Sequence, residues 1–460
     1  MIPVPLRLPN DCVGQSFAKT AKPLRNISIT PSNASYRWKH PNALCQKILP
    51  ATASHDHLAK GVRRAVSNLL RASSSEYLLG LALFCLFIGF RIVAFAWPSL
   101  TFGLYGDSYQ YYVPAGLEYI SGRLPSSLNP EHPPLAKYII GFFALYSGGP
   151  VVGTILFSAM SGGLAFLLSR KLTSNSRWAL VAVWFMAFDQ VNILISSDPM
   201  LEIFMLFFAL LGVYCTLTAT RPVHFAATGL MLGFAVACKW SGLSFLLGVL
   251  LFFIINHKYL AWLLVSTTAC AAYLFSYAVL IIEKGFGSFF DLQIWMLKFM
   301  SSTHPVPNDM ILRAFSWVIF HSTTFAWVLG YDPSLHPEAF SFLGAHFISF
   351  VNEINPTITL LIFPVLFWQL HSYRSQKQEA AKLMLLILIT TAVGELAFVR
   401  TEPWLYSPLD AIVSIMAPSM LLALADKGRM YRVGVYTFLA LVAIWPIIHV
   451  YLHLRGAFVF

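Results

Sequence analysis

Ionisable side chains lie beside long apolar stretches at three places in this chain of 460 residues. The first is a polar stretch that holds Asp107, Glu131 and His132 among tyrosines and prolines. The others are Glu202, at the beginning of one apolar stretch, and Lys239, between two more. Because a lone charge beside hydrocarbon is costly, each residue needs a partner or a function. A carboxylate could act as a general base toward a hydroxyl, and a cation could bind an anion.

The composition is that of a membrane protein. Hydrophobic residues make up 57% of the chain and charged residues only 11%, with a mean hydropathy of +0.67. The net charge is +11, and residues 1–75 carry most of it, with eleven basic and two acidic side chains. We therefore expect no nucleic-acid partner. Residues 1–75 are predicted to be a basic, disordered cytoplasmic tail, unless they precede the true start codon.

A helix needs about 20 apolar residues to cross a membrane once. Residues 76–460 contain many apolar segments of about this length. We predict an all-α, polytopic fold with about eleven transmembrane helices. These lie at 77–97, 150–169, 178–195, 200–219, 223–239, 241–256, 259–282, 350–370, 383–399, 408–424 and 433–452. Lysine and arginine gather in the short connections that share a side with the N-terminus, which is therefore predicted to be cytoplasmic. The long loops 98–149 and 283–349 are then extracytoplasmic, and the protein is expected in the cell membrane.

The polar residues of the first long loop have both structural and functional interpretations. Asp107 could be a general base whose pKa is raised among tyrosines, or the N-cap of a helix that begins at Ser108. Glu131 and His132 lie in the proline-rich sequence Asn-Pro-Glu-His-Pro-Pro. This rigid backbone could hold them for binding, or could be only the turn before a helix that begins near Leu135.

The charges within the predicted bundle also leave alternatives open. Glu202 would lie in the first turn of a helix, where it complements the helix dipole, but a second acid, Asp198, lies close by. Lys239 could extend to solvent or bind an anion. Arg91 and Glu395 lie inside predicted spans, where a partner on another helix is the simplest explanation.

Several motifs, taken in order, resemble those of protein O-mannosyltransferases, a family of the GT-C superfamily of membrane glycosyltransferases. They are His132-Pro133-Pro134-Leu135-Ala136-Lys137, Met200-Leu201-Glu202, Ala237-Cys238-Lys239-Trp240-Ser241-Gly242-Leu243, and the later Gln293, Met296 and His304. The family has Asp-Glu where this chain has Asp107-Ser108. Loop 283–349 is too short for the folded domain of eukaryotic members, which favours a compact prokaryotic type.

The resemblance implies inverting transfer of a sugar, mannose in the family, from a polyprenyl or dolichyl phosphate to an acceptor hydroxyl on the outer face. The acceptor would be a protein Ser or Thr. Asp107 would be the catalytic base, Glu131 and Glu202 would orient sugar or acceptor, and Trp240 would pack against sugar or lipid. The basic residues expected to stabilise the leaving phosphate are Lys239, His132, His304 and Arg400. No cofactor is obligatory and no metal site is assigned, although the acids could hold a divalent ion.

Two alternatives to this function differ in what they transfer or move. Within the same superfamily, the acceptor could be a lipid-linked glycan or a glycolipid. In a different class, a lipid or solute transporter would place its charges along a path through the bilayer, and often shows internal repeats. The charges of this chain gather instead at the predicted outer ends of helices, and no repeat is evident, which favours the enzyme.

Overall fold

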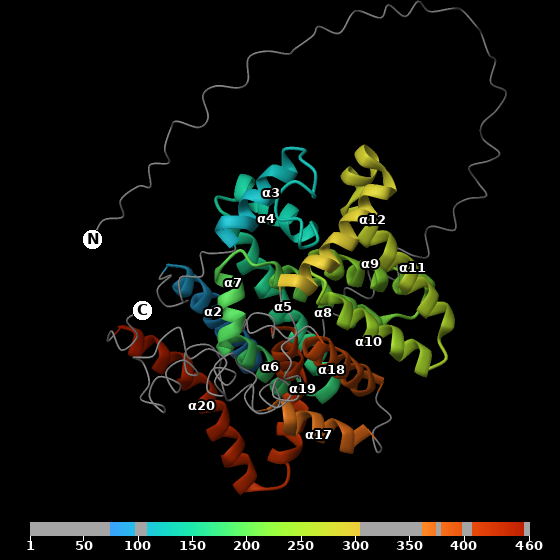
Figure 1. Ribbon diagram of the computed structural model, residues 1–460. Coiled ribbons are helices and arrows are strands. Elements are labelled where there is room, and N and C mark those ends of the chain that lie inside the picture. The colour runs from blue at the N-terminus through green and yellow to red at the C-terminus, as the bar shows by residue number, and fades with distance from the viewer. Residues whose placement is uncertain (1–73, 97–107, 304–360, 374–378, 398–406, 455–460) are drawn as a thin grey trace, which may run out of the picture. The chain divides into compact units, whose positions relative to one another are not determined.

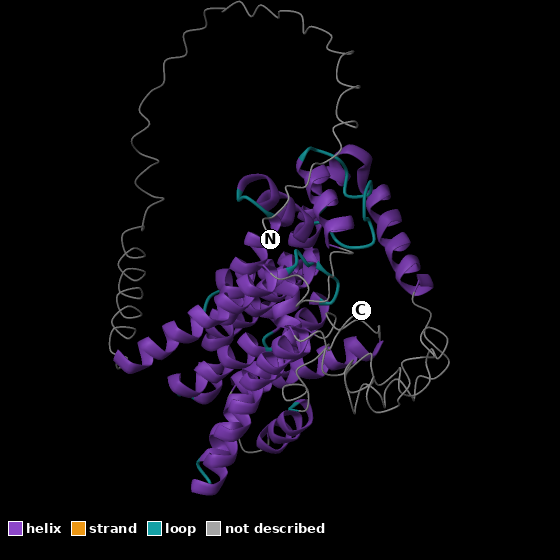
Figure 2. Ribbon diagram, turned by 90° about the vertical axis from the view of Figure 1, so that its left-hand side faces the viewer, coloured by secondary structure: helices purple, strands orange, loops and turns teal. Residues whose placement is uncertain are grey.

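The computed structural model describes residues 74–96, 108–303, 361–373, 379–397 and 407–454, all within the compact unit Ala72–Phe460 (Figure 1). The described residues form helices and connecting turns, without a strand (Figure 2). The helices are α2 (Ser74–Ala96), η4 (Ser108–Tyr112), α3 (Val113–Ile120), α4 (Leu135–Tyr146), α5 (Pro150–Thr173), α6 (Ser176–Phe188), α7 (Gln190–Ser197), α8 (Leu201–Thr218), α9 (Pro222–Cys238), α10 (Gly242–Ile255), α11 (Tyr259–Ser276), α12 (Ala278–Thr303), α17 (Ile362–Tyr373), α18 (Glu379–Ala397), α19 (Ser407–Ala425) and α20 (Arg429–Leu454).

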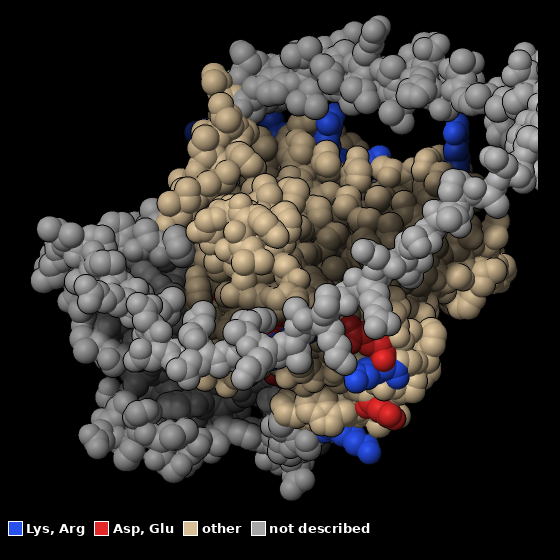
Figure 3. All heavy atoms as spheres, turned by 90° about the horizontal axis from the view of Figure 1, so that it is seen from above, with Lys and Arg blue, Asp and Glu red and all other residues tan. Residues whose placement is uncertain are grey.

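A helix covers all or part of every predicted span. By length and composition, four described helices could each cross a membrane: α5, α8, α11 and α19. The bent pair α6 and α7 would make a fifth. Wide areas of the described surface seen in Figure 3 carry no charged side chain, as expected for a surface in contact with hydrocarbon. The chain is therefore an all-α integral membrane protein, and the number eleven stays a prediction.

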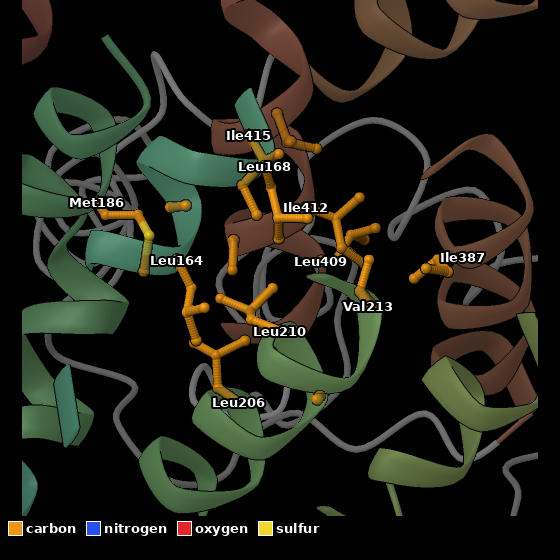
Figure 4. Packing of buried hydrophobic residues seen from close by; sticks show 14 of the residues in the cluster. Leu164, Leu168, Met186, Leu206, Leu210, Val213, Ile387, Leu409, Ile412 and Ile415 are labelled. Atoms are coloured by element: carbon orange, nitrogen blue, oxygen red, sulfur yellow. The ribbon is translucent and has the colours of Figure 1, made fainter. Parts of the chain in front are cut away.

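Helix α19 lies in the middle of the main core. It packs against α5, α6 and α18, and most of its residues are buried. Figure 4 shows where these helices meet. The side chains labelled there are Leu164 and Leu168 of α5, Met186 of α6, Leu206, Leu210 and Val213 of α8, Ile387 of α18, and Leu409, Ile412 and Ile415 of α19. This core fixes the position of α8, which begins with Leu201 and Glu202.

The predicted span 178–195 is not one straight helix, because the chain bends by 70° between α6 and α7. The Asp189 carboxylate accepts hydrogen bonds from the backbone N–H groups of Val191 and Asn192, each at 3.3 Å. Asp189 thus caps α7, and the cap supplies partners for backbone groups that a break would otherwise leave unsatisfied.

The intramembrane Arg91 of α2 has interhelical partners, as predicted. It donates to Ser158 Oγ of α5 at 2.7 Å and to the Met186 carbonyl of α6 at 3.0 Å. The Asp189 carboxylate also interacts with it electrostatically. Arg91 therefore joins three helices of the bundle, and its role is structural. The side chain of Glu395 lies outside the described part.

The first predicted outer loop contains a tight helical hairpin. Helix α4 begins at Leu135, as the sequence predicts, and crosses α3 through two glycines. A Cβ atom on Gly116 would lie 2.4 Å from the Lys137 carbonyl oxygen and 2.8 Å from the Gly141 backbone nitrogen. Only glycine permits so close an approach. The hairpin therefore gives the loop a fixed scaffold, and α4 in turn contacts α8 and α9.

The predicted span 259–282 extends too far. Helix α11 ends at Ser276, and α12 begins at Ala278 after a turn at Tyr277. The helical geometry of α12 is interrupted at Gly285, whose φ of 81° favours glycine. The beginning of the second predicted outer loop is thus a helix, while residues 304–349 of that loop lie outside the described part.

Candidate functional site

The clearest feature of the site is a buried ion pair between Glu202 and Lys239. Glu202 lies in the first turn of α8, as predicted, and Lys239 directly follows the last residue of α9. The Lys239 ammonium donates to Glu202 Oε1, and the two side chains are only 9% and 1% exposed. The alternative in which Lys239 extends to solvent is therefore wrong, because the pair is enclosed by helices.

The turn that carries Lys239 folds back closely on α9. A Cβ atom on Gly242, the first residue of α10, would lie 2.7 Å from the carbonyl carbon of Ala235. The backbone N–H of Gly242 donates to the Lys239 carbonyl at 3.0 Å. Glycine at this position lets the beginning of α10 approach the end of α9 this closely. The ammonium of Lys239 reaches Glu202 of α8.

The second carboxylate oxygen of the pair is unused. Glu202 Oε2 is buried and has no hydrogen-bond partner among the described residues. Buried polar atoms almost always have a partner, so an acceptor left open here points to a ligand or a water molecule. The pair could thus present both a cation and an open carboxylate oxygen to one substrate.

A second acid, Asp198, lies one turn before Glu202, in the connection between α7 and α8. Its Oδ1 accepts a hydrogen bond from Ser108 Oγ, and both residues are buried. Ser108 is the chain neighbour of Asp107, the predicted base, which itself lies outside the described residues. The contact attaches Ser108, which precedes the hairpin, to the connection between α7 and α8. Asp198 was not among the predicted substrate-binding residues, although an acid before proline at the end of an apolar segment was a usable signal.

The predicted pair Glu131 and His132 lies in the segment between α3 and α4, and Lys137 holds that segment. The fully buried Lys137 ammonium donates to the Asn129 carbonyl and, at 2.8 Å, to the His132 carbonyl. Asn129 adopts a left-handed backbone with φ 49°, which asparagine tolerates, and its amide donates to Glu131. The His132 ring meets Tyr112 edge to face, with centroids 6.0 Å apart.

Burial lowers the pKa of Lys137 to about 7, and the nearby Glu131 carboxylate partly opposes the shift. Lys137 belongs to a helix that is not among the candidate spans. The sequence includes it in a motif, but nothing in the spacing shows that its ammonium turns back to the loop. This positioning role becomes visible only once α4 is seen to begin at Leu135 and to bring Lys137 beneath the preceding segment.

Trp240 connects the Lys239 turn to α11 and α12. Its indole N–H donates to the Tyr273 hydroxyl at 2.9 Å, and that hydroxyl donates to Gln293 Oε1 at 2.7 Å. Trp240 also packs against a small core formed by Tyr277, Leu280, Phe289, Leu292 and Met296. Its predicted contact with sugar or lipid stays a prediction, as do the roles of His304 and Arg400, which lie outside the described residues.

No group of three or more His, Cys, Asp or Glu side chains suited to a metal ion occurs among the described residues. Asp107 lies outside the described residues, so the expectation that no cofactor is obligatory stays a prediction. The described candidates instead form two groups. One is the buried pair with Trp240 beside it, and the other is the Glu131–His132 segment on the hairpin.

The fold resembles those of solved membrane proteins. The chain is similar to the oligosaccharyltransferase of Archaeoglobus fulgidus in its apo form, with a TM-score of 0.50 and 12% identity over 83% of this chain. The match covers 56% of that protein, so this chain spans little more than half of its length. It is also similar to ArnT from Cupriavidus metallidurans bound to undecaprenyl phosphate, with a TM-score of 0.44 and 13% identity over 83% of this chain and 76% of that one. The all-α fold is GT-C-like.

Part of the chain also matches the sequence model of a protein family. Residues 152–283 match the model described as dolichyl-phosphate-mannose-protein mannosyltransferase. The matched part includes Glu202, Lys239 and Trp240, and the match confirms the resemblance that the motifs predict. No curated protein sequence matches the chain.

Proposed function

We propose that this protein is a membrane glycosyltransferase that moves a sugar from a polyprenyl phosphate to an acceptor hydroxyl. The observation that carries the proposal is the buried Glu202–Lys239 pair with its open carboxylate oxygen. The pair lies inside the segment that matches the mannosyltransferase family. In a pair that served only the fold, both carboxylate oxygens of Glu202 would have hydrogen-bond partners. Apolar side chains could also replace such a pair without loss of stability, since buried ion pairs seldom stabilise a fold.

The chemistry assigns a role to each group. The bond between the anomeric carbon and the phosphate oxygen breaks, and a bond from that carbon to the acceptor oxygen forms with inversion. The acceptor proton goes to a base, for which we propose Asp107. The phosphate leaves on the lipid with added negative charge, which the Lys239 ammonium can stabilise. This ammonium has three donors and gives one to Glu202, so two stay available for the phosphate.

The carboxylates divide the binding of the sugar and the acceptor. Glu202 Oε2 can accept a hydrogen bond from a hydroxyl of the sugar. Asp198 anchors Ser108, and through it the chain neighbour Asp107, to the α7–α8 connection. Glu131 and His132 would complete the site from the hairpin, on a backbone held by Lys137. His304 and Arg400 would add positive charge for the phosphate.

For the finer specificity we propose mannose as the sugar and a protein Ser or Thr as the acceptor, by analogy with the family whose model matches. We also propose that the site faces the extracytoplasmic side of the cell membrane, with the N-terminus in the cytoplasm. The distribution of basic residues in the short connections supports this orientation.

The test is sugar transfer by the purified, full-length protein in lipid. Polyprenyl-phosphate mannose and polyprenyl-phosphate glucose are each offered with a Ser/Thr-rich peptide or with a glycolipid. We expect transfer from the mannosyl donor to the peptide, and a loss of about 100-fold or more in Asp107→Asn. Transfer to the glycolipid but not to the peptide would show that the acceptor is a glycolipid and not a protein Ser or Thr. If no donor supports transfer and the protein moves labelled lipid between leaflets, the protein is a transporter and not a glycosyltransferase.

A further inference from the structure

Tyr119, near the end of α3, holds the segment that connects α3 to α4. Its side chain is buried, and its hydroxyl donates to the carbonyl oxygen of Pro125 at 2.8 Å and to that of Leu128. Burial raises the pKa of Tyr119 above its ordinary value of 10.0, so the hydroxyl keeps its proton and stays a donor. Tyr119 therefore binds the connecting segment at two points outside the helices.

Lys137 holds the remainder of the same segment from the other helix of the hairpin. Its ammonium donates to the carbonyl oxygens of Asn129 and His132. The same ammonium lies 5.8 Å from the centre of the Tyr119 ring. Two buried side chains thus bind four carbonyl groups of one short segment. The positions of Glu131 and His132 therefore depend on Tyr119 as well as on Lys137.

The connecting segment also packs against the small core that contains Tyr277. Leu124 is partly buried against this core, and Trp240 contacts the same core. Tyr119 and Tyr277 lie close enough to interact electrostatically. The backbone turns tightly after Leu124, because the backbone N–H and the hydroxyl of Ser127 both donate to the Leu124 carbonyl, at 2.9 and 2.7 Å. The segment thus has a defined contact with the turn between α11 and α12.

The small core connects the two groups of candidate residues. Trp240 directly follows Lys239, and the Lys239 ammonium donates to Glu202. Leu124 belongs to the segment that carries Glu131. Both groups therefore contact one packed unit, and the way in which the connecting segment packs on this unit sets the distance between them.

We propose that Tyr119 is a positioning residue for sugar transfer, and that the two groups of candidate residues form a single substrate site. This inference rests on the proposed function. Because its hydroxyl is directed to backbone carbonyls, Tyr119 acts through the connecting segment and not on the substrate. It holds the segment where Leu124 meets the small core, and so sets the distance between Glu131 and Lys239.

The kinetic test uses the full-length protein in lipid nanodiscs, with polyprenyl-phosphate mannose and the Ser/Thr-rich peptide. Tyr119→Phe removes only the hydroxyl, so the connecting segment loses a donor while the ring still fills its place. We expect the KM of the mannosyl donor or of the peptide to rise by about tenfold, with kcat within about twofold of the wild type. A role in folding alone would reduce the amount of active protein, which lowers kcat and leaves KM unchanged.

The matched control is Tyr138→Phe. The Tyr138 ring lies 5.5 Å from the Tyr119 ring, but its buried hydroxyl has no hydrogen-bond partner in the described part of the chain. Because the substitution removes the same group without breaking a described hydrogen bond, both KM values should equal those of the wild type. Unchanged KM values in Tyr119→Phe would overturn the proposal, and so would an equal rise in both variants.

Leu124→Ala tests whether the connecting segment acts through the small core. The substitution shortens the side chain that meets the core, so it should raise the same KM as Tyr119→Phe. Because both changes displace one segment, the rise in the double variant should be smaller than the product of the two single rises. A rise equal to that product would show that the two residues act independently, and would contradict the proposal.

A readout that needs no sugar transfer separates this proposal from the proposed function. The Arg123 side chain is 68% exposed, and the bond that follows it is a trypsin site within the connecting segment. By mass spectrometry, we expect trypsin to cleave this bond about fivefold faster in Tyr119→Phe than in the wild type or in Tyr138→Phe. Unchanged cleavage would overturn the proposal even in a protein that transfers sugar. Faster cleavage in a protein that transfers no sugar would confirm that Tyr119 holds the segment and would overturn its role in transfer.

Discussion

Two lysines of this protein are buried, and their ammonium groups have different kinds of hydrogen-bond partner. Lys239 meets the carboxylate of Glu202, on another helix, whereas Lys137 donates to two carbonyl oxygens of its own preceding segment. The first arrangement leaves an open carboxylate oxygen beside a cation. The second provides a donor for two carbonyl groups that have no partner within a helix or a sheet. The comparison separates a lysine suited to binding substrate from one suited to holding a loop.

The energetics of the two arrangements also differ. Removing one member of a buried ion pair leaves a charge without compensation, which costs far more than the intact pair contributes. Removing the ammonium of Lys137 leaves only neutral carbonyl groups without partners. Substitutions at the two positions should therefore have unequal effects on stability and on transfer.

The largest effect is expected for Lys239→Met. The change isolates the buried Glu202 carboxylate, so the free energy of unfolding should fall by about 3–5 kcal/mol. Sugar transfer should fall by about 100-fold or more, because a cation at the leaving phosphate is lost. Thermal unfolding in detergent and the transfer assay measure the two losses.

The matched control is Lys258→Met. Lys258 also pairs with a glutamate, Glu379, at 3.1 Å, but the two side chains are 40% and 61% exposed. Exposed pairs contribute at most about 1 kcal/mol, and this one is remote in sequence from the site motifs, so both stability and transfer should stay close to those of the wild type. Equal losses in Lys239→Met and Lys258→Met would remove the distinction on which the site depends.

A smaller loss of stability is expected for Lys137→Met. The variant keeps the bulk of the side chain but leaves the carbonyls of Asn129 and His132 without their donor, at a cost of about 1–3 kcal/mol. If the hairpin binds substrate, the KM of the donor or acceptor should rise while the bundle still unfolds cooperatively. Lys137→Arg, which retains donors, should recover part of the affinity. Unchanged transfer in both variants would leave the hairpin with no role in binding.

The contribution of Lys137 to stability should also depend on pH. In the folded protein burial lowers the pKa of Lys137 to about 7, whereas its ordinary value is 10.5. Between these values the unfolded chain binds a proton that the folded protein lacks, so the free energy of unfolding rises with pH. Below pH 7 the contribution is constant. Unfolding of the wild type and of Lys137→Met from pH 6 to pH 10 should show this rise only in the wild type, and parallel curves would contradict it.

A loss of stability of similar size is expected for Gly116→Ala, which perturbs the scaffold of Lys137 and leaves the Lys137 side chain unchanged. The new Cβ would meet the Lys137 carbonyl and the Gly141 backbone, and separating α3 from α4 should cost about 1–3 kcal/mol. Gly163→Ala is the control, because a Cβ there meets nothing within 4 Å. A neutral Gly116→Ala would mean that the hairpin is not closely packed.

Much of the fold could be predicted because the helices are long apolar segments, and the position of Glu202 in the first turn of α8 followed from where its segment begins. The differences between the predicted and the observed helices have physical reasons. Hydrophobicity continues through Asp189 and past Ser276, so the bend before α7 and the end of α11 depend on a side-chain cap and on a turn. Polarity alone singled out Glu202 and Lys239. Their pairing could not be predicted, because it depends on how α8 packs against α9.

The most direct test of the account is a double variant, Glu202→Met with Lys239→Met, compared with Lys239→Met alone. Apolar side chains can replace a buried pair with little loss, so stability should return to within about 1 kcal/mol of the wild type. Transfer from polyprenyl-phosphate mannose should stay at least about 100-fold below the wild type, because the phosphate-binding cation is still absent. Recovery of transfer together with stability would show that the pair serves only the fold, and would contradict the proposed site.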